Sequence, residues 1–301
     1  VYYVCLDDSM TVAAVSRDGY YIYTYHAPAL QSVTLNSAAS IGEYAFAYCR
    51  QLTDVTLNDS ITEIPQYAFA GCISLQNIDL SKIVTIGDYA FMESEALAAV
   101  DLSAAESIGE YAFVNGKALQ RVKLSPNGTD MAEGVFAYCE RLTDVENLNC
   151  SKNVGDYSFA YAGLTGADLT GAVNVGTHAF MKETMTPFTV KLGENLETLG
   201  DNPFAMCALE PFCITEVKNF NGVDYEDKIY TYEISPSVAV IDGSLYCKIA
   251  TGLELITYAG IDHIDVKIAD DTVRITAMAF AGSDVKMVTL PYTVRSIGHK
   301  A

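Results

Sequence analysis

The amino-acid sequence predicts an α/β, β-rich solenoid, in which units of about 22 residues stack on one another. Three observations predict this fold. A phenylalanine recurs at nearly constant spacing, a short strand pattern ends about eleven residues before it, and a corner segment with a glycine lies between the two. One such unit cannot bury its own apolar face, so neighbouring units must share a continuous core.

The recurring phenylalanine is usually preceded by alanine, and its first eight copies are about 21 to 24 residues apart. We predict that this side chain points into the core of every unit. The nine predicted core residues are Phe46, Phe69, Phe91, Phe113, Phe136, Phe159, Phe180, Phe204 and Phe280.

The strand pattern is a leucine, two variable residues and then an aliphatic–variable–aliphatic triplet, as in Leu52, Val55 and Leu57. Alternation with a period of two predicts a strand with one buried face. The copy that ends at Leu148 carries one additional residue after Val145. An extra residue in a strand predicts a β-bulge there.

The corner segment is best seen in Ile41-Gly42-Glu43-Tyr44-Ala45-Phe46. Its glycine suits a tight corner, because glycine adopts backbone conformations that other residues avoid. The Tyr-Ala-Phe part predicts a short helical turn. Each unit therefore consists of one strand, a corner, and a phenylalanine with several aliphatic residues directed inward.

The segment from Ile41 to Leu57, Ile-Gly-x-Tyr-Ala-Phe-x-x-Cys-x-x-Leu-x-x-Val-x-Leu, resembles the BspA-type leucine-rich repeats of bacterial and protist cell-surface proteins. The resemblance covers about Leu30 to Ile214 and His263 to Ala301. It implies a curved, right-handed leucine-rich repeat superhelix with a parallel β-sheet on the concave face and short helical turns or strands on the convex side. It also implies surface display and adhesion without a shared enzymatic activity, which is an analogy of fold.

We predict four segments: an N-terminal β-hairpin or cap over 1–29, a solenoid over 30–216, a β-hairpin insert over 217–262, and continuing repeats over 263–301 that stop in mid-repeat. The last point predicts a fragment of a longer protein. The stretch Asp242 to Gly260 looks like an insert common in the resembled family. It either forms a ligand platform on the solenoid edge or joins two solenoid stacks, and we favour the joining role.

Charge excludes several classes of partner. Asp and Glu number 38 against 18 Lys and Arg, which gives a formal net charge of −20. Such a chain repels phosphate backbones and anionic membrane surfaces, so we predict no binding to nucleic acid. No run of about eighteen apolar residues occurs, so we predict no membrane insertion by this segment.

No catalytic motif is visible in the sequence. Phosphate-binding loops, dinucleotide glycine fingerprints, serine elbows, zinc-protease helices and calcium-loop signatures are all missing. We therefore predict no enzyme, no catalytic or metal site and no cofactor. The densest group of ligand types is Asp262, His263 and Asp265 with Asp270 and Asp271, and its spacing favours a solvated loop over a cation site.

Four of the eight cysteines lie three residues after the repeat phenylalanine, where other copies have serine, glycine or alanine. This position suits a small packing residue, and cysteine acts there as a small hydrophobe with a weak hydrogen-bond donor. We predict reduced, buried thiols at Cys49, Cys72, Cys139 and Cys207. A disulfide between Cys49 and Cys72 is the alternative, because neighbouring coils are about 4.8 Å apart.

A candidate binding surface follows from the strand pattern, because residues between the buried positions face solvent on the predicted concave side. Like charges on neighbouring coils would repel, and a basic partner or cation would relieve them. An ordinary solvated face is the simpler interpretation. The candidate face consists of Asp54, Asp79, Asp101, Arg121, Lys123, Asp144, Glu146 and Asp168.

A second candidate surface is the tyrosine two residues before the repeat phenylalanine. Tyrosine offers contact area at a low entropy cost, as binding surfaces require. Stacking of rings between coils is a sufficient explanation for the repeat of this residue, and we favour it. The copies are Tyr44, Tyr67, Tyr89, Tyr111 and Tyr157, and a second tyrosine position of the same surface holds Tyr48, Tyr138 and Tyr161.

We therefore expect a non-enzymatic, adhesin-like interaction module of a secreted or cell-surface protein. It would bind a protein or a glycan, such as a host matrix or cell-surface component, through the solenoid surface. The alternative is a structural spacer that displays another domain and binds nothing itself. Both place the chain outside the cell or on its surface.

Overall fold

The computed structural model describes residues 2–4, 13–15, 29–36, 38–183, 186–209, 232–241, 244–258 and 265–301. The chain divides into two compact units, unit 1 (Val1–Leu164) and unit 2 (Thr165–Ala301), and each is described by itself. Both consist of short strands and turns, and the one helix among the described residues is the 3₁₀ helix η1 (Leu148–Cys150).

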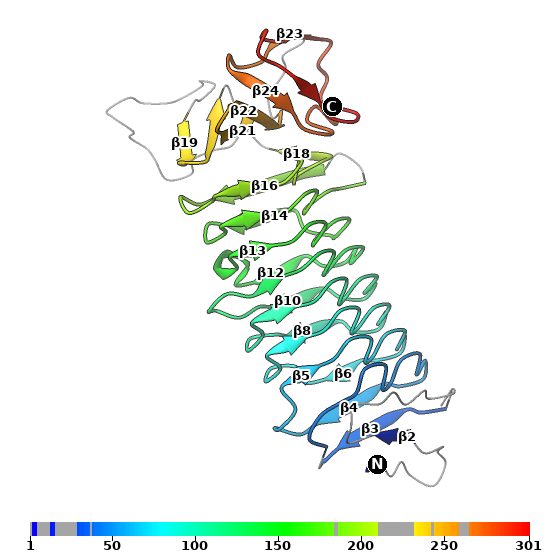
Figure 1. The fold of residues 1–301 in the computed structure, drawn as a ribbon. Coiled ribbons are helices and arrows are strands. Elements are labelled where there is room, and N and C mark those ends of the chain that lie inside the picture. Colours follow the sequence, from blue (N-terminus) through cyan, green and yellow to red (C-terminus); the bar gives the residue numbers. More distant parts are fainter. Residues whose placement is uncertain are drawn as a thin grey trace. The chain divides into compact units, whose positions relative to one another are not determined.

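One side of each coil in unit 1, which we call the strand face, carries the predicted repeat strands in two parallel sheets (Figure 1). Equivalent residues pair in register, as Val33 does with Val55 and Val100 with Val122. The predicted solenoid of parallel strands is thereby confirmed. The strands are β3 (Ser32–Leu35), β4 (Asp54–Leu57), β6 (Asn77–Ile78), β8 (Ala99–Asp101), β10 (Arg121–Lys123) and β12 (Asp144–Glu146).

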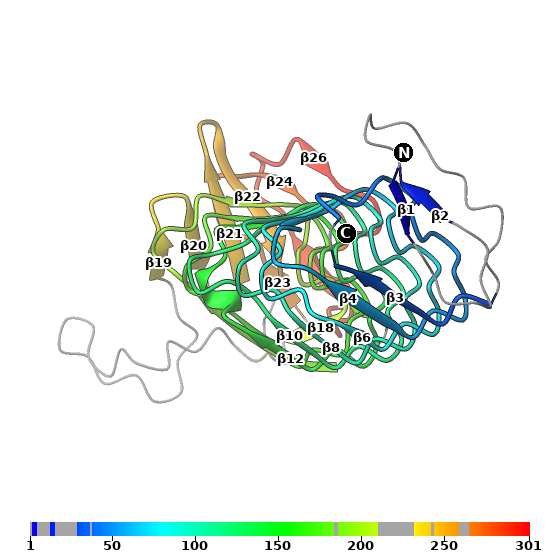
Figure 2. The ribbon, with the colours of Figure 1, turned by 90° about the horizontal axis from the view of Figure 1, so that it is seen from below.

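A second side of the coils is a ladder of two-residue parallel strands. In each strand the first side chain faces outward and the second is a buried aliphatic residue, such as Ile64 or Ile86. Figure 2 looks along the coils and shows β3, β4 and β6 together on their own side. The strands of the second side are β5 (Glu63–Ile64), β7 (Thr85–Ile86), β9 (Ser107–Ile108), β11 (Asp130–Met131) and β13 (Asn153–Val154).

The remaining side is a column of turns around the repeat phenylalanine, residues 43–48 and their equivalents in later coils, which we call the corner column. The expected short helical turn does not form here. Tyr44 and Tyr48 have φ of 57° and 59°, which a right-handed helix excludes. The left-handed residues are four positions apart, and every second N–H in this segment points along the stack. Thus Tyr44 and Phe46 donate to the carbonyl oxygens of Gln66 and Ala68 at 3.1 and 2.8 Å.

The repeat phenylalanines form the centre of the core in unit 1. The side chains from Phe46 to Phe159 are each at most 2% exposed. Their rings stack from coil to coil with centroids 5.0 to 5.4 Å apart. Burial of apolar area drives this packing, and the offset stacking of aromatic rings adds to it.

The β-bulge predicted near Leu148 is wrong. β12 pairs with β10 without any shift of register, from Arg121 opposite Asp144 onward. The extra residue is accommodated after the strand, where Asn147 adopts φ of 63° and the helix η1 follows. The Asn147 side-chain amide donates to the carbonyl oxygen of Leu124 at 2.9 Å. A loop absorbs the insertion at less cost than the sheet, because no ladder hydrogen bond is lost.

Unit 2 begins with further coils of the same kind. Phe180 and Phe204 are buried, with ring centroids 5.7 Å apart. The strand expected to end at Phe212 and Ile214 is described only as far as Leu209, and the rest lies outside the described residues. The strands are β14 (Gly166–Leu169), β16 (Thr186–Leu192) and β18 (Cys207–Leu209) on one side, and β15 (Asn174–Val175) and β17 (Thr198–Leu199) on another.

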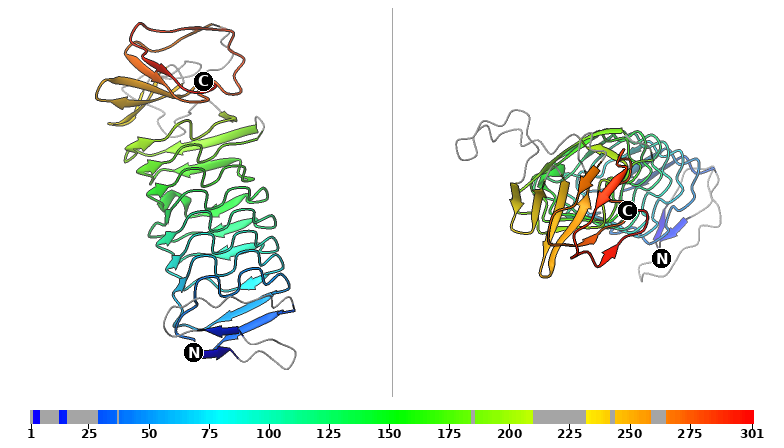
Figure 3. Two further views of the ribbon diagram at one scale, coloured as in Figure 1. Left: turned by 45° about the vertical axis from the view of Figure 1, so that its right-hand side comes forward. Right: turned by 90° about the horizontal axis from the view of Figure 1, so that it is seen from above.

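The interruption of the repeat forms an antiparallel run of four strands. Its last strand pairs in parallel with the next coil, so insert and repeats share one sheet (Figure 3). This pairing favours the joining role, and Phe280 of the following coil is partly buried. The strands are β19 (Tyr232–Ser235), β20 (Val238–Ile241), β21 (Ser244–Ile249) and β22 (Gly252–Thr257), then β23 (Asp265–Lys267), β24 (Thr272–Ile275), β25 (Met287–Thr289) and β26 (Ser296–Ile297).

At the N-terminal side, β1 (Tyr2–Val4) and β2 (Ala13–Val15) pair antiparallel. The turn expected at 7–9 lies outside the described residues. The division into segments 1–29, 30–216, 217–262 and 263–301 stays a prediction. None of the helices in the described ranges has the length and apolar character to cross a membrane.

Truncation of a repeat phenylalanine tests the core. Phe91→Ala should lower the free energy of unfolding by about 3–5 kcal/mol, because the ring is fully buried between two others. Urea denaturation followed by circular dichroism measures this change. Thr34→Ala, at an exposed strand position, is the control and should change stability by less than about 0.5 kcal/mol. A cost below about 1 kcal/mol for Phe91→Ala contradicts the stacked core.

Two glycines test the backbone of the corner column. Gly134 has φ of 64°, and a Cβ there would overlap the Tyr111 ring, whereas a Cβ at Gly42 meets nothing within 4 Å. We expect Gly134→Ala to destabilise unit 1 by about 1–3 kcal/mol. Gly42→Ala should be neutral or slightly stabilising, by up to about 1 kcal/mol. Thermal melts of the two variants compare them, and equal effects are incompatible with this geometry.

Candidate interaction surfaces

The candidate residue nearest the start of the strand face is Asp54 on β4. Its carboxylate accepts hydrogen bonds from the Thr53 hydroxyl at 2.5 Å and from the Asn77 amide of the next coil at 2.6 Å. These two donors lower the pKa of the Asp54 carboxyl. The residue is therefore ionised and held in place at neutral pH.

The centre of the strand face is an interleaved set of charges. Arg121 Nε lies 2.9 Å from Asp144 Oδ2, and Lys123 Nζ lies 3.2 Å from Asp101 Oδ2. In-register pairing of β8, β10 and β12 places these side chains next to one another. All four are partly exposed, so each pair contributes about 0–1 kcal/mol. The repulsion expected among the acidic residues is thus relieved within the chain.

Asp79 and Asp101 have the same local support. The Asp79 carboxylate accepts the Ser81 N–H at 3.0 Å, and the hydroxyl and N–H of Ser81 lower the pKa of Asp79. Burial alone would raise the pKa of Asp101, but hydrogen bonds from Ser103 and Lys123 outweigh it, and the pKa is lowered. Because these pKa values lie below those of the unfolded chain, the resulting stabilisation is present above about pH 4 and is lost as the pH falls further.

Two candidate residues remain. Glu146 is exposed at the end of β12, where its register partner on β10 is Lys123. Asp168 belongs to unit 2, where its Oδ2 is 3.7 Å from Lys191 Nζ on the neighbouring strand. Within unit 1 the structure therefore brings together Asp101, Lys123 and Glu146 in one register row, and pairs Arg121 with Asp144.

The tyrosines of the corner column stack as the sequence predicts. Ring centroids are 4.7 Å apart from Tyr44 to Tyr67, 4.8 Å from Tyr67 to Tyr89 and 5.4 Å from Tyr89 to Tyr111. Gly134 follows in the next coil, and its missing side chain leaves room for the Tyr111 ring. Stacking therefore covers the ring faces between neighbouring coils.

An acidic position of the corner column escaped the sequence interpretation. It precedes the stacked tyrosine, three residues before the repeat phenylalanine, and this constant offset was the signal that could have revealed it. All its acidic copies in unit 1 are exposed or partly exposed. The Tyr111 hydroxyl donates to the Glu133 carboxylate, which raises the pKa of Tyr111. The acidic copies are Glu43, Asp88, Glu110, Glu133 and Asp156.

The described cysteines, Cys49, Cys72, Cys139, Cys150, Cys207 and Cys247, are free thiols. Cys72 and Cys139 donate from Sγ to the carbonyl oxygens of Phe46 and Phe113 at 3.1 and 3.2 Å. Burial raises the pKa of Cys139 to about 12 and that of Cys49 to about 11. Cys150 alone among the six is not fully buried. Cys5 and Cys213 lie outside the described residues.

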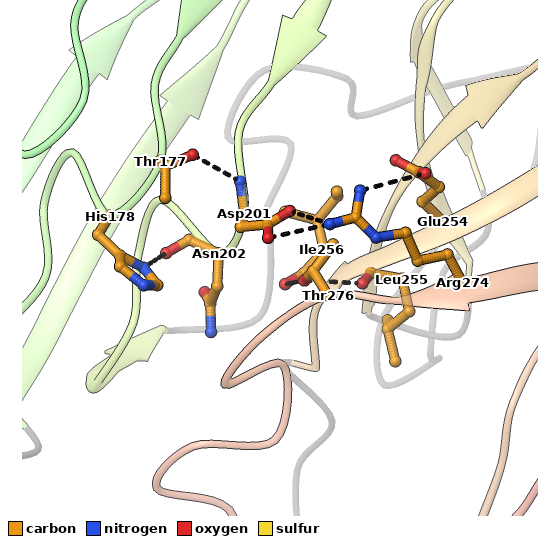
Figure 4. A network of polar contacts seen from close by, with 9 residues as sticks. All are labelled: Thr177, His178, Asp201, Asn202, Glu254, Leu255, Ile256, Arg274 and Thr276. Atoms are coloured by element: carbon orange, nitrogen blue, oxygen red, sulfur yellow. Dashed lines mark hydrogen bonds and ion pairs between the residues drawn. The ribbon is translucent and has the colours of Figure 1, made fainter. Parts of the chain in front are cut away.

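Unit 2 holds a polar network around Arg274 (Figure 4). Its guanidinium contacts both carboxylate oxygens of Asp201 at 2.9 and 3.0 Å, and lies 3.5 Å from Glu254. Asp201 belongs to a coil before the insert, Glu254 to the last insert strand and Arg274 to the coil after it. Both contacts to Asp201 use Nη2, and Nη1 faces Glu254, so one guanidinium connects these three segments within the unit.

Asn202 extends this network on the same coil. Its side-chain amide donates to the carbonyl oxygen of Met278, and its Oδ1 accepts the Thr257 hydroxyl at 2.6 Å. The main-chain oxygen of Asn202 is 3.1 Å from His178 Nδ1, as Figure 4 shows. These contacts connect segments before, within and after the insert, so the network holds unit 2 together.

A metal centre finds no support in the described part of the chain. There, no three residues among His, Cys, Asp and Glu are arranged to hold an ion. Asp262 and His263 lie outside the described residues. Asp265 is on β23, and Asp270 lies 3.6 Å from Lys267.

In-register parallel strands, a leucine-lined core and one phenylalanine corner in each coil define a solenoid of the leucine-rich repeat class. The profile of the BspA type leucine-rich repeat region matches the chain in six copies, over residues 19–143, 86–210, 152–260 and 257–301. The chain belongs to this family, as its sequence predicts.

Three solved structures that match this chain are those of bacterial leucine-rich repeat proteins. A leucine rich cell surface protein from Faecalibacterium prausnitzii A2-165 is 22% identical over 99% of this chain and 73% of that one, with a TM-score of 0.62, which shows the shared fold. The T. pallidum leucine-rich repeat protein TpLRR is 29% identical over 44% of this chain, with a TM-score of 0.41, and the match spans 64% of its length. A Bacteroides ovatus leucine-rich repeat protein is 15% identical over 90% of this chain and 75% of that one, with a TM-score of 0.43. The search of curated proteins gave no match.

Thiol labelling tests the burial of the cysteines. In a Cys5→Ser/Cys213→Ser variant at pH 8, we expect a maleimide to label about one thiol promptly, at Cys150, because the other five are buried and protonated. Mass spectrometry of tryptic peptides identifies the labelled residue, and denatured protein labelled at all six provides the control. Prompt native labelling of Cys72 or Cys139 is the contrary result.

Proposed function

We propose that this chain is a non-enzymatic interaction module of a secreted or cell-surface protein, which binds a protein or a glycan in the manner of an adhesin. The strand face carries this proposal. There, the parallel strands pair in register, so exposed charged side chains occupy equivalent positions in successive coils. The family, and a structural neighbour described as a cell surface protein, support a location on or outside the cell.

Rigidity makes the strand face suitable for binding. Hydrogen bonds from Thr53, Asn77, Ser81 and Ser103 hold its carboxylates in fixed positions. A partner therefore does not have to order them, which lowers the cost of association. The proposed binding residues are Asp54, Asp79, Asp101, Arg121, Lys123, Asp144 and Glu146 in unit 1, and Asp168 in unit 2.

A structural spacer is the second candidate function. The ion pairs Arg121–Asp144 and Lys123–Asp101 favour it, because charges that already neutralise one another need no partner. Such a module would hold a neighbouring domain at a distance and would itself bind nothing.

The test is charge reversal on the strand face. The full chain and its Asp79→Lys/Asp101→Lys variant are tested for binding to immobilised host matrix proteins and to a glycan array. We expect the variant to lose affinity for the bound component by about tenfold, since two favourable contacts become repulsive. Thr34→Ala/Thr56→Ala on the same face is the control for folding and should bind normally.

Two results contradict the proposal. Unchanged binding by the charge-reversal variant rules out the strand face as the site. No binding of the unmodified chain to any component, with adhesion retained by its neighbouring domains, favours the spacer.

A further inference from the structure

We propose that the corner column of unit 1 docks a lysine- and arginine-rich segment of a partner polypeptide. This inference rests on the proposed function as an interaction module, and it names a second surface and the chemistry of its partner. Three features support it. The column has exposed aromatic side chains, the backbone beneath them is held by hydrogen bonds, and the acidic residues of the column have no basic residues at the positions between them.

The first feature is the set of exposed aromatic side chains in unit 1. Among the described residues of unit 1, the large hydrophobic side chains that are exposed are Tyr44 at 40%, Tyr48 at 52% and Tyr138 at 47%. All three flank the repeat phenylalanine at a distance of two residues. Tyrosine is enriched at protein interfaces, because a large ring with few rotatable bonds is immobilised at small entropic cost.

The backbone beneath these tyrosines is held at each coil. The amides of Tyr44 and Tyr48 donate to carbonyl oxygens of the next coil at 3.1 and 2.6 Å, and the Tyr138 amide does so at 2.8 Å. The rings are held as well, since Tyr44 stacks on Tyr67 and Tyr138 on Tyr161, each at 4.7 Å. The surface is therefore organised before a partner arrives.

The charge of this surface has one sign. The acidic position of the column, given above, has five carboxylates in six coils, and Gln66 is the sixth residue. The outward position of the neighbouring two-residue strands also lacks basic residues. It consists of Glu63, Thr85, Ser107, Asp130 and Asn153.

Basic residues near the column occupy other positions. Arg50, Lys117 and Arg141 follow the repeat phenylalanine by four or five residues, outside both acidic positions, and Lys117 pairs with Glu95. On the strand face, in contrast, Arg121 and Lys123 alternate with the acidic residues. The corner column thus keeps an uninterrupted negative potential, whereas on the strand face Arg121 and Lys123 offset the charges of Asp144 and Asp101.

Charge complementarity decides the kind of occupant. A second copy of this chain carries the same negative charge and would be repelled, as would nucleic acid or an anionic membrane. A cationic segment would place ammonium or guanidinium groups beside the carboxylates and lay its aliphatic stems over the tyrosine edges. Contacts with ring faces are restricted, because stacking covers them.

The experiment compares two variants with the same change in charge. The corner variant is Glu43→Gln/Glu110→Gln/Asp156→Asn, and the strand-face variant is Asp54→Asn/Asp79→Asn/Asp144→Asn. Fluorescent peptides that alternate lysine or arginine with serine are titrated into the full chain, and fluorescence anisotropy is measured at about 50 and 150 mM NaCl. A glutamate–serine peptide is the control for charge, and circular dichroism melts check that both variants fold.

We expect the corner variant to weaken binding of the basic peptides by about tenfold and the strand-face variant by less than about twofold. Tyr48→Ser/Tyr138→Ser should weaken it by about threefold without any change of charge. Equal losses in both charge variants, a larger loss in the strand-face variant, or no binding of basic peptides overturns the inference. The proposed function fails separately, when the unmodified chain binds no matrix protein or glycan.

Discussion

The hydrogen bonds between successive corners are the interaction on which the rest of each unit depends. In the corner column, alternate amides donate in one direction along the stack, from Tyr44 and Phe46 to the next coil and from Tyr67 and Phe69 to the one after. This requires left-handed tyrosines, which cost about 1–2 kcal/mol each. Satisfied backbone donors and ring stacking offset that cost, because an unpaired buried N–H would be more expensive.

Other features follow from this spacing of the corners. The phenylalanine rings meet at 5.0 to 5.4 Å because their own amides are bonded from coil to coil. In unit 1 the position three residues later holds a small side chain, and its cysteine or serine donates to the phenylalanine carbonyl of the preceding coil, as Cys72 and Ser94 do. Surface residues follow the same period, so equivalent tyrosines and carboxylates lie next to one another in successive coils. The regular arrangement of such a surface therefore results from the regular packing of the core.

The strands, the phenylalanine core and the tyrosine stacking could all be predicted from the sequence. Each rests on residue type at a fixed period, which places equivalent side chains next to one another in neighbouring coils. The corner conformation could not, because Tyr-Ala-Phe contains no residue that signals positive φ, and a helical turn was the natural expectation. The extra residue after Val145 was also misplaced, since spacing shows that a residue has been added but not which backbone segment absorbs it.

The candidate surfaces divide in the same way. Sequence alone determined which residues alternate along the strands, where the cores of the coils lie and how acidic the chain is. Only the tertiary structure decided that Arg121 and Lys123 neutralise Asp144 and Asp101, that the carboxylates before the tyrosines are not interleaved with basic residues, and that the insert pairs with the coil that follows it. The physical reason is that period is a property of one unit, whereas pairing between units depends on register and on the direction of each backbone donor.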